Sequence, residues 1–122
     1  MKEEQIQKLL KEKGCPEFMW KGGSRYLIDS WKKFVEDVER GYCHDCLFDE
    51  YLNDLDTRTL IRLAGLDDNV KDLDERFKVM LTRNDLRVSP EKPDVTNDFW
   101  NFGYPKNATG YFLQEIHRVI KV

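Results

Sequence analysis

The feature that most constrains the fold is a run of apolar side chains at helical spacing between residues 24 and 41. Ser24 can cap the start of a helix there, and Gly41 stands where a left-handed C-terminal residue is expected. Between them the apolar positions recur every three or four residues, at Leu27, Trp31, Phe34, Val35 and Val38. Charged side chains fill the opposite face. The pattern predicts an amphipathic helix of about four turns that buries an aromatic stripe.

Five further segments show helical spacing of apolar residues, and most begin after an Asp or end at a Gly. Such residues are common at helix starts and ends, respectively. The predicted helices cover residues 3–13, 45–55, 57–64, 67–81 and 109–120. Together with the segment at 24–41 they predict a chain built from short amphipathic helices.

Two segments lack this spacing. Residues 15–23 are expected to form a loop or a single turn that covers one end of the core. Pro90 and Pro93 exclude a regular helix from 84 to 96. Within that stretch, Leu86 to Val88 is compatible with one short strand, for which the sequence shows no partner. We therefore expect one all-α domain, residues 1–122, of five or six helices with an irregular, aromatic-rich segment before the last helix.

The composition is that of a folded, soluble chain. Hydrophobic residues make up 40% and aromatic residues 12% of the 122 residues, which is too much for a disordered chain. No apolar stretch reaches the roughly 18 residues that a membrane span needs. The first residues lack the apolar segment of a secretory signal. Three cysteines are too few for a disulfide scaffold and favour a reducing compartment. A cytoplasmic protein without a membrane partner is expected.

Negative charge is concentrated in the middle of the chain. Residues 43–75 contain ten acidic and three basic side chains, a formal charge of −7, whereas the flanking parts are weakly positive. Such a stretch favours a basic protein partner if it forms one patch. The candidate contact residues are Glu50, Asp54, Asp68 and Asp72. The alternative is a solvated face on which acids cap helices.

The same charges argue against nucleic acid and against a strong metal site. Residues 60–77 have the outline of a helix-turn-helix, but acids would lead its second helix toward the phosphates. The carboxylate pairs Glu50/Asp54 and Asp68/Asp72 are four residues apart, which is also compatible with a weak Mg²⁺ or Ca²⁺ site. The apolar residues, however, occupy the inward positions. We expect no nucleic-acid partner and no cofactor.

A second candidate contact region is the aromatic segment from Phe99 to Tyr104. Its Trp100, Phe102 and Tyr104 could anchor a protein partner, because Trp and Tyr are frequent in interface hot spots. They could instead fold back onto the last helix as a satellite core. A small-ligand pocket of a sensor or enzyme is a third interpretation. Packing of the segment against its own copy in a homo-oligomer is also compatible with the pattern.

Cys43-His44-Asp45-Cys46 is a C-x-x-C sequence. Cysteines at this spacing can bind zinc or form a redox-active disulfide. A structural zinc site needs two more ligands. Of the remaining candidates, His44 lies between the two cysteines and is poorly placed to join the same site, and Cys15 and His117 lie near opposite ends of the chain. A thioredoxin-like site would need a strand–helix–strand context that is not predicted here. The plainer interpretation is two half-buried residues at a helix start, so no metal site is expected.

The catalytic residue types are sparse. There is no Gly-rich phosphate loop, no serine in a nucleophile-elbow setting, and there are only two histidines. No enzymatic activity is therefore assigned. The chain resembles small acidic inhibitors such as bacterial immunity proteins in size and charge only. The expected function is a non-enzymatic protein-interaction module, with a zinc or redox protein and a small-ligand protein as alternatives.

Overall fold

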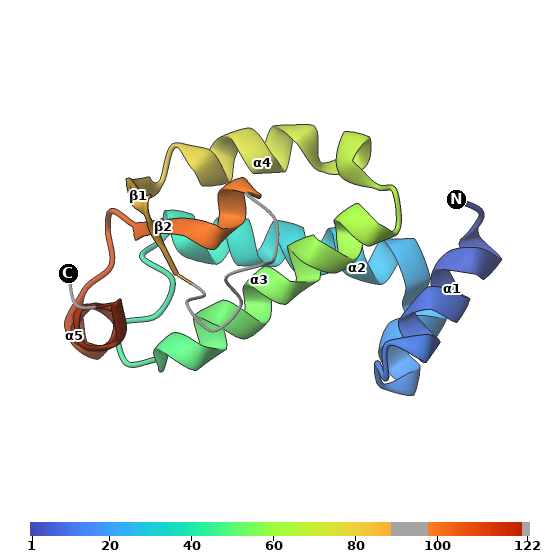
Figure 1. The fold of residues 1–122 in the computed structure, drawn as a ribbon, viewed down its shortest axis with the longest axis horizontal. Coiled ribbons are helices and arrows are strands. Elements are labelled where there is room, and N and C mark those ends of the chain that lie inside the picture. The colour runs from blue at the N-terminus through green and yellow to red at the C-terminus, as the bar shows by residue number, and fades with distance from the viewer. Residues whose placement is uncertain (89–97, 121–122) are drawn as a thin grey trace.

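The structure is a computed structural model that describes residues 1–88 and 98–120 (Figure 1). Its elements follow one another as α1 (Glu3–Glu12), α2 (Glu17–Glu39), α3 (Phe48–Leu63), the 3-10 turn η1 (Asp67–Val70), α4 (Lys71–Lys78), β1 (Leu81–Arg87), the 3-10 turn η2 (Phe99–Asn101), β2 (Phe102–Pro105) and α5 (Gly110–Ile120). The protein is mostly helical, as expected, but it also contains a small sheet. The all-α expectation is therefore correct only in part.

The longest helix, α2, organises the fold. It contacts α1, α3 and α4, and α5 in turn packs against α3. Figure 1 shows α5 and the two strands gathered at one end of the molecule, while α1 and the start of α2 project at the other end. At the centre, Trp31 and Phe34 of α2 pack against Phe77 of α4, with ring centroids 5.2–5.6 Å apart. The predicted aromatic stripe is thus buried.

A kink divides α2 into two pieces. Gly23 has φ 59° and ψ −136°, which is outside the helical region, and the residues before it are helical from Glu17. The loop expected at 15–23 is therefore largely a helix. The start predicted at Ser24 is present as the second piece, where Glu3 of α1 accepts hydrogen bonds from the Ser24 backbone N–H at 2.9 Å and from its hydroxyl at 2.6 Å. These bonds fasten α1 to the kink.

Where the sequence suggested two helices, at 45–55 and 57–64, the structure has one. α3 runs without interruption from Phe48 to Leu63, and Asp56 lies exposed in its interior. An Asp inside a helix costs at most about 0.7 kcal/mol. The continuous helix places Tyr51, Leu55 and Ile61 together in the core. Burial of those side chains outweighs the preference of Asp56 for a position at the start of a helix.

The short strand expected at 86–88 is part of a longer strand that begins at Leu81, where the end of a helix was expected, and its partner lies in the aromatic segment. β1 pairs with β2 in antiparallel orientation, with Leu81 opposite Pro105 and Thr82 opposite Tyr104. The strands approach closely at Gly103, where φ is +73° and a Cβ atom would lie 2.5 Å from the carbonyl oxygen of Thr82. A glycine is required at this position. Of the region expected to be irregular, residues 89–97 lie outside the described part of the chain.

Candidate functional site

The four acidic candidates do not form one surface. Glu50 and Asp54 belong to the first two turns of α3, whereas Asp68 and Asp72 belong to η1 and the first turn of α4. Figure 1 shows that α4 begins at the far end of α3, so the helix separates the two pairs. The two pairs are therefore two candidate sites.

The environment of the second pair is that of a solvated helix start. The carboxylates of Asp68 and Asp72 are exposed, and Lys71 lies 3.4 Å from Asp68. Near them, Arg58 pairs with the buried carboxylate of Asp74 and with the partly exposed carboxylate of Asp67. Part of the negative charge counted along the sequence is therefore neutralised by internal ion pairs.

The first pair, Glu50 and Asp54, lies on a segment whose charged side chains are all acidic. Residues 45–56 contain five acids and no Lys or Arg. Asp54 is half-buried and accepts a hydrogen bond of 2.8 Å from the phenol of Tyr42. Burial raises the pKa of Asp54, and the charges of Asp37 and Glu50 add to this effect, against the opposing influence of the Tyr42 hydrogen bond and of Lys33. Asp37, Glu50 and Asp54 thus form a carboxylate cluster between α2 and α3 that we call the acidic cluster.

Replacement of Asp54 by asparagine tests whether burial and the neighbouring acids make the ionised form of Asp54 unfavourable. Because the pKa of Asp54 is raised in the folded state, its ionised form destabilises the fold, and the cost is present at pH 7 and disappears as the pH falls through that pKa. Asp54→Asn keeps an acceptor for Tyr42 and removes the charge. We expect the variant to be more stable than the wild type at pH 7, with the difference shrinking toward pH 4, in denaturant unfolding.

The matched control is Asp72→Asn, which removes the same charge from an exposed position. An equal gain in both variants would show that only net charge matters. No gain in Asp54→Asn at pH 7 would contradict the proposed repulsion within the acidic cluster.

The aromatic segment is divided between the core and the surface. Trp100 is fully buried, and its indole N–H donates to the hydroxyl of Thr59 at 3.1 Å. Phe102 and Tyr104 are half-buried, and the Tyr104 ring lies 6.3 Å from that of His117 on α5. Trp100 would have to leave the core to contact a partner, so of the three aromatic candidates Phe102 and Tyr104 are the two that offer accessible surface.

A hollow next to Phe99 and Phe102 bears on the small-ligand alternative. It has a volume of about 320 Å³ and is also lined by Lys78, Leu81 and Asn84. Lys78 is directed over the Phe99 ring at 4.6 Å and pairs with Glu75.

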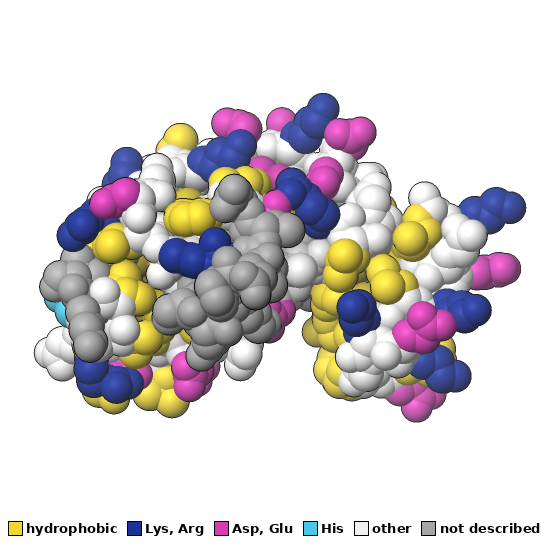
Figure 2. Space-filling model, viewed as in Figure 1, with side chains coloured by type: hydrophobic (Ala, Val, Ile, Leu, Met, Phe, Trp, Pro, Cys, Tyr) yellow, Lys and Arg dark blue, Asp and Glu magenta, His cyan; other side chains and the backbone are white. Residues whose placement is uncertain are grey.

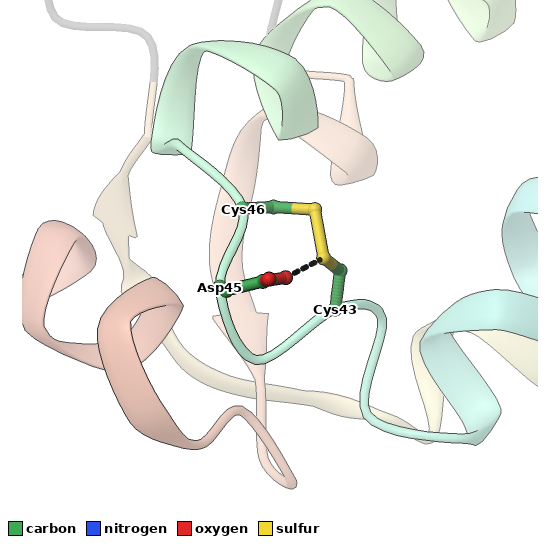
Figure 3. A group of neighbouring side chains, drawn as sticks. All are labelled: Cys43, Asp45 and Cys46. Atoms are coloured by element: carbon green, nitrogen blue, oxygen red, sulfur yellow. Dashed lines mark hydrogen bonds between the residues drawn. A yellow bond between two sulfur atoms is a disulfide. The ribbon is translucent and has the colours of Figure 1, made fainter.

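The C-x-x-C sequence forms a disulfide in a short connection between α2 and α3. Figure 3 shows Cys43 and Cys46 joined, with the carboxylate of Asp45 directed at Cys43; the Oδ1–Sγ distance is 3.0 Å. The backbone carbonyl of His44 accepts a hydrogen bond of 3.0 Å from the N–H of Phe112 in α5. The connection therefore links the starts of α3 and α5.

For the zinc alternative, the described residues bring together three possible ligand atoms but not a fourth. Cys43, Asp45 and Cys46 have donor atoms within 4.8 Å of one another, and no other His, Cys, Asp or Glu of the described residues joins this group. Cys15 and His117, the further ligands considered from the sequence, are not part of it. A structural zinc site takes four protein ligands, and the sulfur–sulfur bond occupies both thiols.

A buried ion pair that the sequence analysis did not find connects three helices. Arg58 of α3 donates to both carboxylate oxygens of Asp74 on α4, at 3.0 and 2.9 Å, and the indole N–H of Trp31 donates to the same carboxylate at 3.0 Å. Desolvation lowers the pKa of Arg58, but the hydrogen bonds and charges of Asp74 and Asp67 outweigh it and raise the pKa overall. A signal was present, because Arg58 follows Tyr51 and Leu55 at helical spacing on the apolar face.

Comparisons with protein-family models, curated proteins and solved structures found no match to this chain. Across residues 1–88 and 98–120, no helix combines the length and the apolar character that crossing a membrane requires. The fold and the sites define a class only: a mostly helical protein with a two-stranded sheet, an acidic cluster on α2 and α3, and a disulfide in the connection between these two helices.

Proposed function

We propose that the protein is a non-enzymatic interaction module that binds a basic protein through the acidic cluster. The supporting observation is the position of Asp54, a half-buried carboxylate whose pKa is raised by burial and, in addition, by repulsion from the charges of Asp37 and Glu50. A Lys or Arg of a partner placed there would relieve this repulsion. Such relief makes the cluster a better docking position than an isolated exposed acid.

The aromatic residues contribute a second part of the proposed surface. Figure 1 shows the start of α3, β2 and α5 at the same end of the molecule. Phe102 and Tyr104 lie on β2 and are partly accessible. In this proposal the acidic cluster steers the partner, and the two rings provide apolar contact after the encounter.

The space-filling view is compatible with a local rather than a global charge effect. Figure 2 shows acidic and basic side chains interspersed over the visible face. The net charge of the chain is only −3. Attraction of a basic partner must therefore come from a local cluster, which is what single charge reversals can test.

The experiment compares tagged wild type with Glu50→Lys and Asp72→Lys, which change the net charge equally at the two ends of α3. Each is used to capture proteins from native lysate at about 10 mM and about 150 mM salt, where the screening lengths are about 30 and 8 Å. We expect wild type and Asp72→Lys to retain the same basic protein at low salt. Glu50→Lys should lose it, with an association rate with the purified partner lowered about tenfold.

Equal losses in both variants would indicate a non-specific charge effect and contradict a local site. A retained partner with an unchanged association rate in Glu50→Lys at low salt would remove the steering role. Phe102→Ala and Tyr104→Ala test the aromatic part, because they should accelerate dissociation and leave association unchanged.

A further inference from the structure

The disulfide connection is not used by the proposed binding surface and has features of its own. It closes a ring from Cys43 to Cys46 directly before α3 begins at Phe48. Both cysteines are partly accessible, and the intervening His44 and Asp45 are exposed. A soluble thiol can therefore reach the sulfur atoms in the folded protein.

The backbone before the disulfide is in a costly conformation. Gly41 has φ 97°, and Tyr42 has φ 63°, a left-handed value that is unusual for a bulky residue. Such a conformation is energetically unfavourable and persists only where the surroundings define it. Tyr42 is held by its bond to Asp54 and by ring contacts with Phe34 and Phe112, at 5.7 and 4.9 Å between centroids.

The contacts that hold the connection between α2 and α3 in place do not depend on the sulfur–sulfur bond. Tyr42 fixes the chain before Cys43, and the start of α3 fixes it after Cys46. The amide of Phe112 holds the carbonyl of His44 between them. With the bond reduced, the two thiols would remain neighbours, and neighbouring thiols reoxidise readily because their effective concentration is high.

The two sulfur atoms have different surroundings. The Asp45 carboxylate lies 3.0 Å from Cys43 Sγ and opposes a negative charge on it. Release of Cys43 as a thiolate is therefore disfavoured, so Cys43 is the sulfur expected to be attacked and Cys46 the sulfur expected to leave.

We propose that Cys43 and Cys46 form a redox-active disulfide that exchanges reversibly with dithiols. A thiolate of the dithiol attacks Cys43 Sγ, the bond between the cysteines breaks, and Cys46 leaves as a thiolate that takes a proton from water. The second thiolate of the dithiol then attacks the dithiol sulfur that is bonded to Cys43. This attack releases Cys43 as a thiolate, which is also protonated. The dithiol becomes a disulfide, and two electrons and two protons reach the protein.

The equilibrium test uses the full chain with Cys15→Ser, so that only two thiols can titrate. Native protein is equilibrated with mixtures of reduced and oxidised dithiothreitol, quenched with acid, alkylated, and analysed by mass spectrometry. We expect the ratio of reduced to oxidised protein to rise tenfold for each tenfold rise in the ratio of reduced to oxidised reagent. Starting from reduced or oxidised protein should give the same ratio.

Three results would overturn the proposal. The first is protein that stays fully reduced in every mixture, and the second is a disulfide that dithiothreitol reduces only after denaturation. The third is one zinc per chain in the purified protein, with both thiols protected from alkylation until a chelator is added. This test is independent of the acidic cluster, so its failure would leave the proposed binding function in place.

The order of attack is tested with glutathione, a monothiol that leaves mixed disulfides to be mapped. We expect the adduct on Cys43 to exceed that on Cys46 severalfold, because the charge of Asp45 disfavours release of Cys43 as a thiolate. Asp45→Asn is the matched variant and should bring the two adducts closer to equal. A dominant adduct on Cys46, or a distribution that Asp45→Asn does not change, would contradict the assigned roles.

Discussion

Replacement of Arg58 by alanine is expected to lower the free energy of unfolding by about 3–5 kcal/mol, because it leaves the carboxylate of Asp74 buried without its cation. Arg58 is 1% and Asp74 6% exposed. Removal of the guanidinium takes away both hydrogen bonds to Asp74 and leaves only Trp31 as a donor. Denaturant unfolding monitored by tryptophan fluorescence measures the loss.

Two variants separate this effect from a general loss of charge. Arg58→Met with Asp74→Leu removes both charges and should recover most of the stability, since apolar pairs often replace buried ion pairs without loss. Arg25→Ala breaks an exposed contact with Asp29 and should change little. If Arg58→Ala is no worse than Arg25→Ala, the ion pair does not hold α3 and α4 together.

Replacement of Trp100 by alanine is expected to cost a similar amount, about 3–5 kcal/mol, for a different reason. The guanidinium groups of Arg58 and Arg62 lie over its fully buried indole, 4.4 and 4.8 Å from the ring centroid. Alanine would leave a large cavity and remove both cation–π contacts. The pairing of β2 with β1 follows directly after this residue, so amide exchange in the sheet should also become faster.

Trp100→Phe is the informative comparison. It keeps an aromatic ring and loses the hydrogen bond to Thr59, and we expect it to cost about 1 kcal/mol for that bond in addition to the lost volume. Phe18→Ala, at a side chain that is 67% exposed, should have a small effect. Nearly equal stability of Trp100→Ala and Phe18→Ala would show that Trp100 does not anchor the segment.

The two substitutions should not be additive. Arg58 contacts both Asp74 and the Trp100 ring, so Arg58→Ala and Trp100→Ala share a contact. A coupling energy of about 0.5–3 kcal/mol is typical of residues in one network. Additive values would mean that the ion pair and the aromatic stack stabilise the fold independently.

Most of the helices could be predicted because the signal that specifies them is local. The spacing of Leu27, Trp31 and Val38 reports a buried face whatever that face packs against. The candidate contact residues were chosen in the same way, from charge along the chain. That choice could not separate Glu50 from Asp72, because distance along a sequence does not give distance across a fold.

The sequence by itself determined where most of the helical segments lie, which stripes are apolar, and that acids outnumber bases in the middle of the chain. The tertiary structure decided the pairing of β1 with β2, the continuity of α3, and the burial of Trp100. The physical reason is the separation of the partners: Trp31 meets Asp74 across 43 residues, and Trp100 meets Thr59 across 41. Contacts of that range form only when the whole chain has packed.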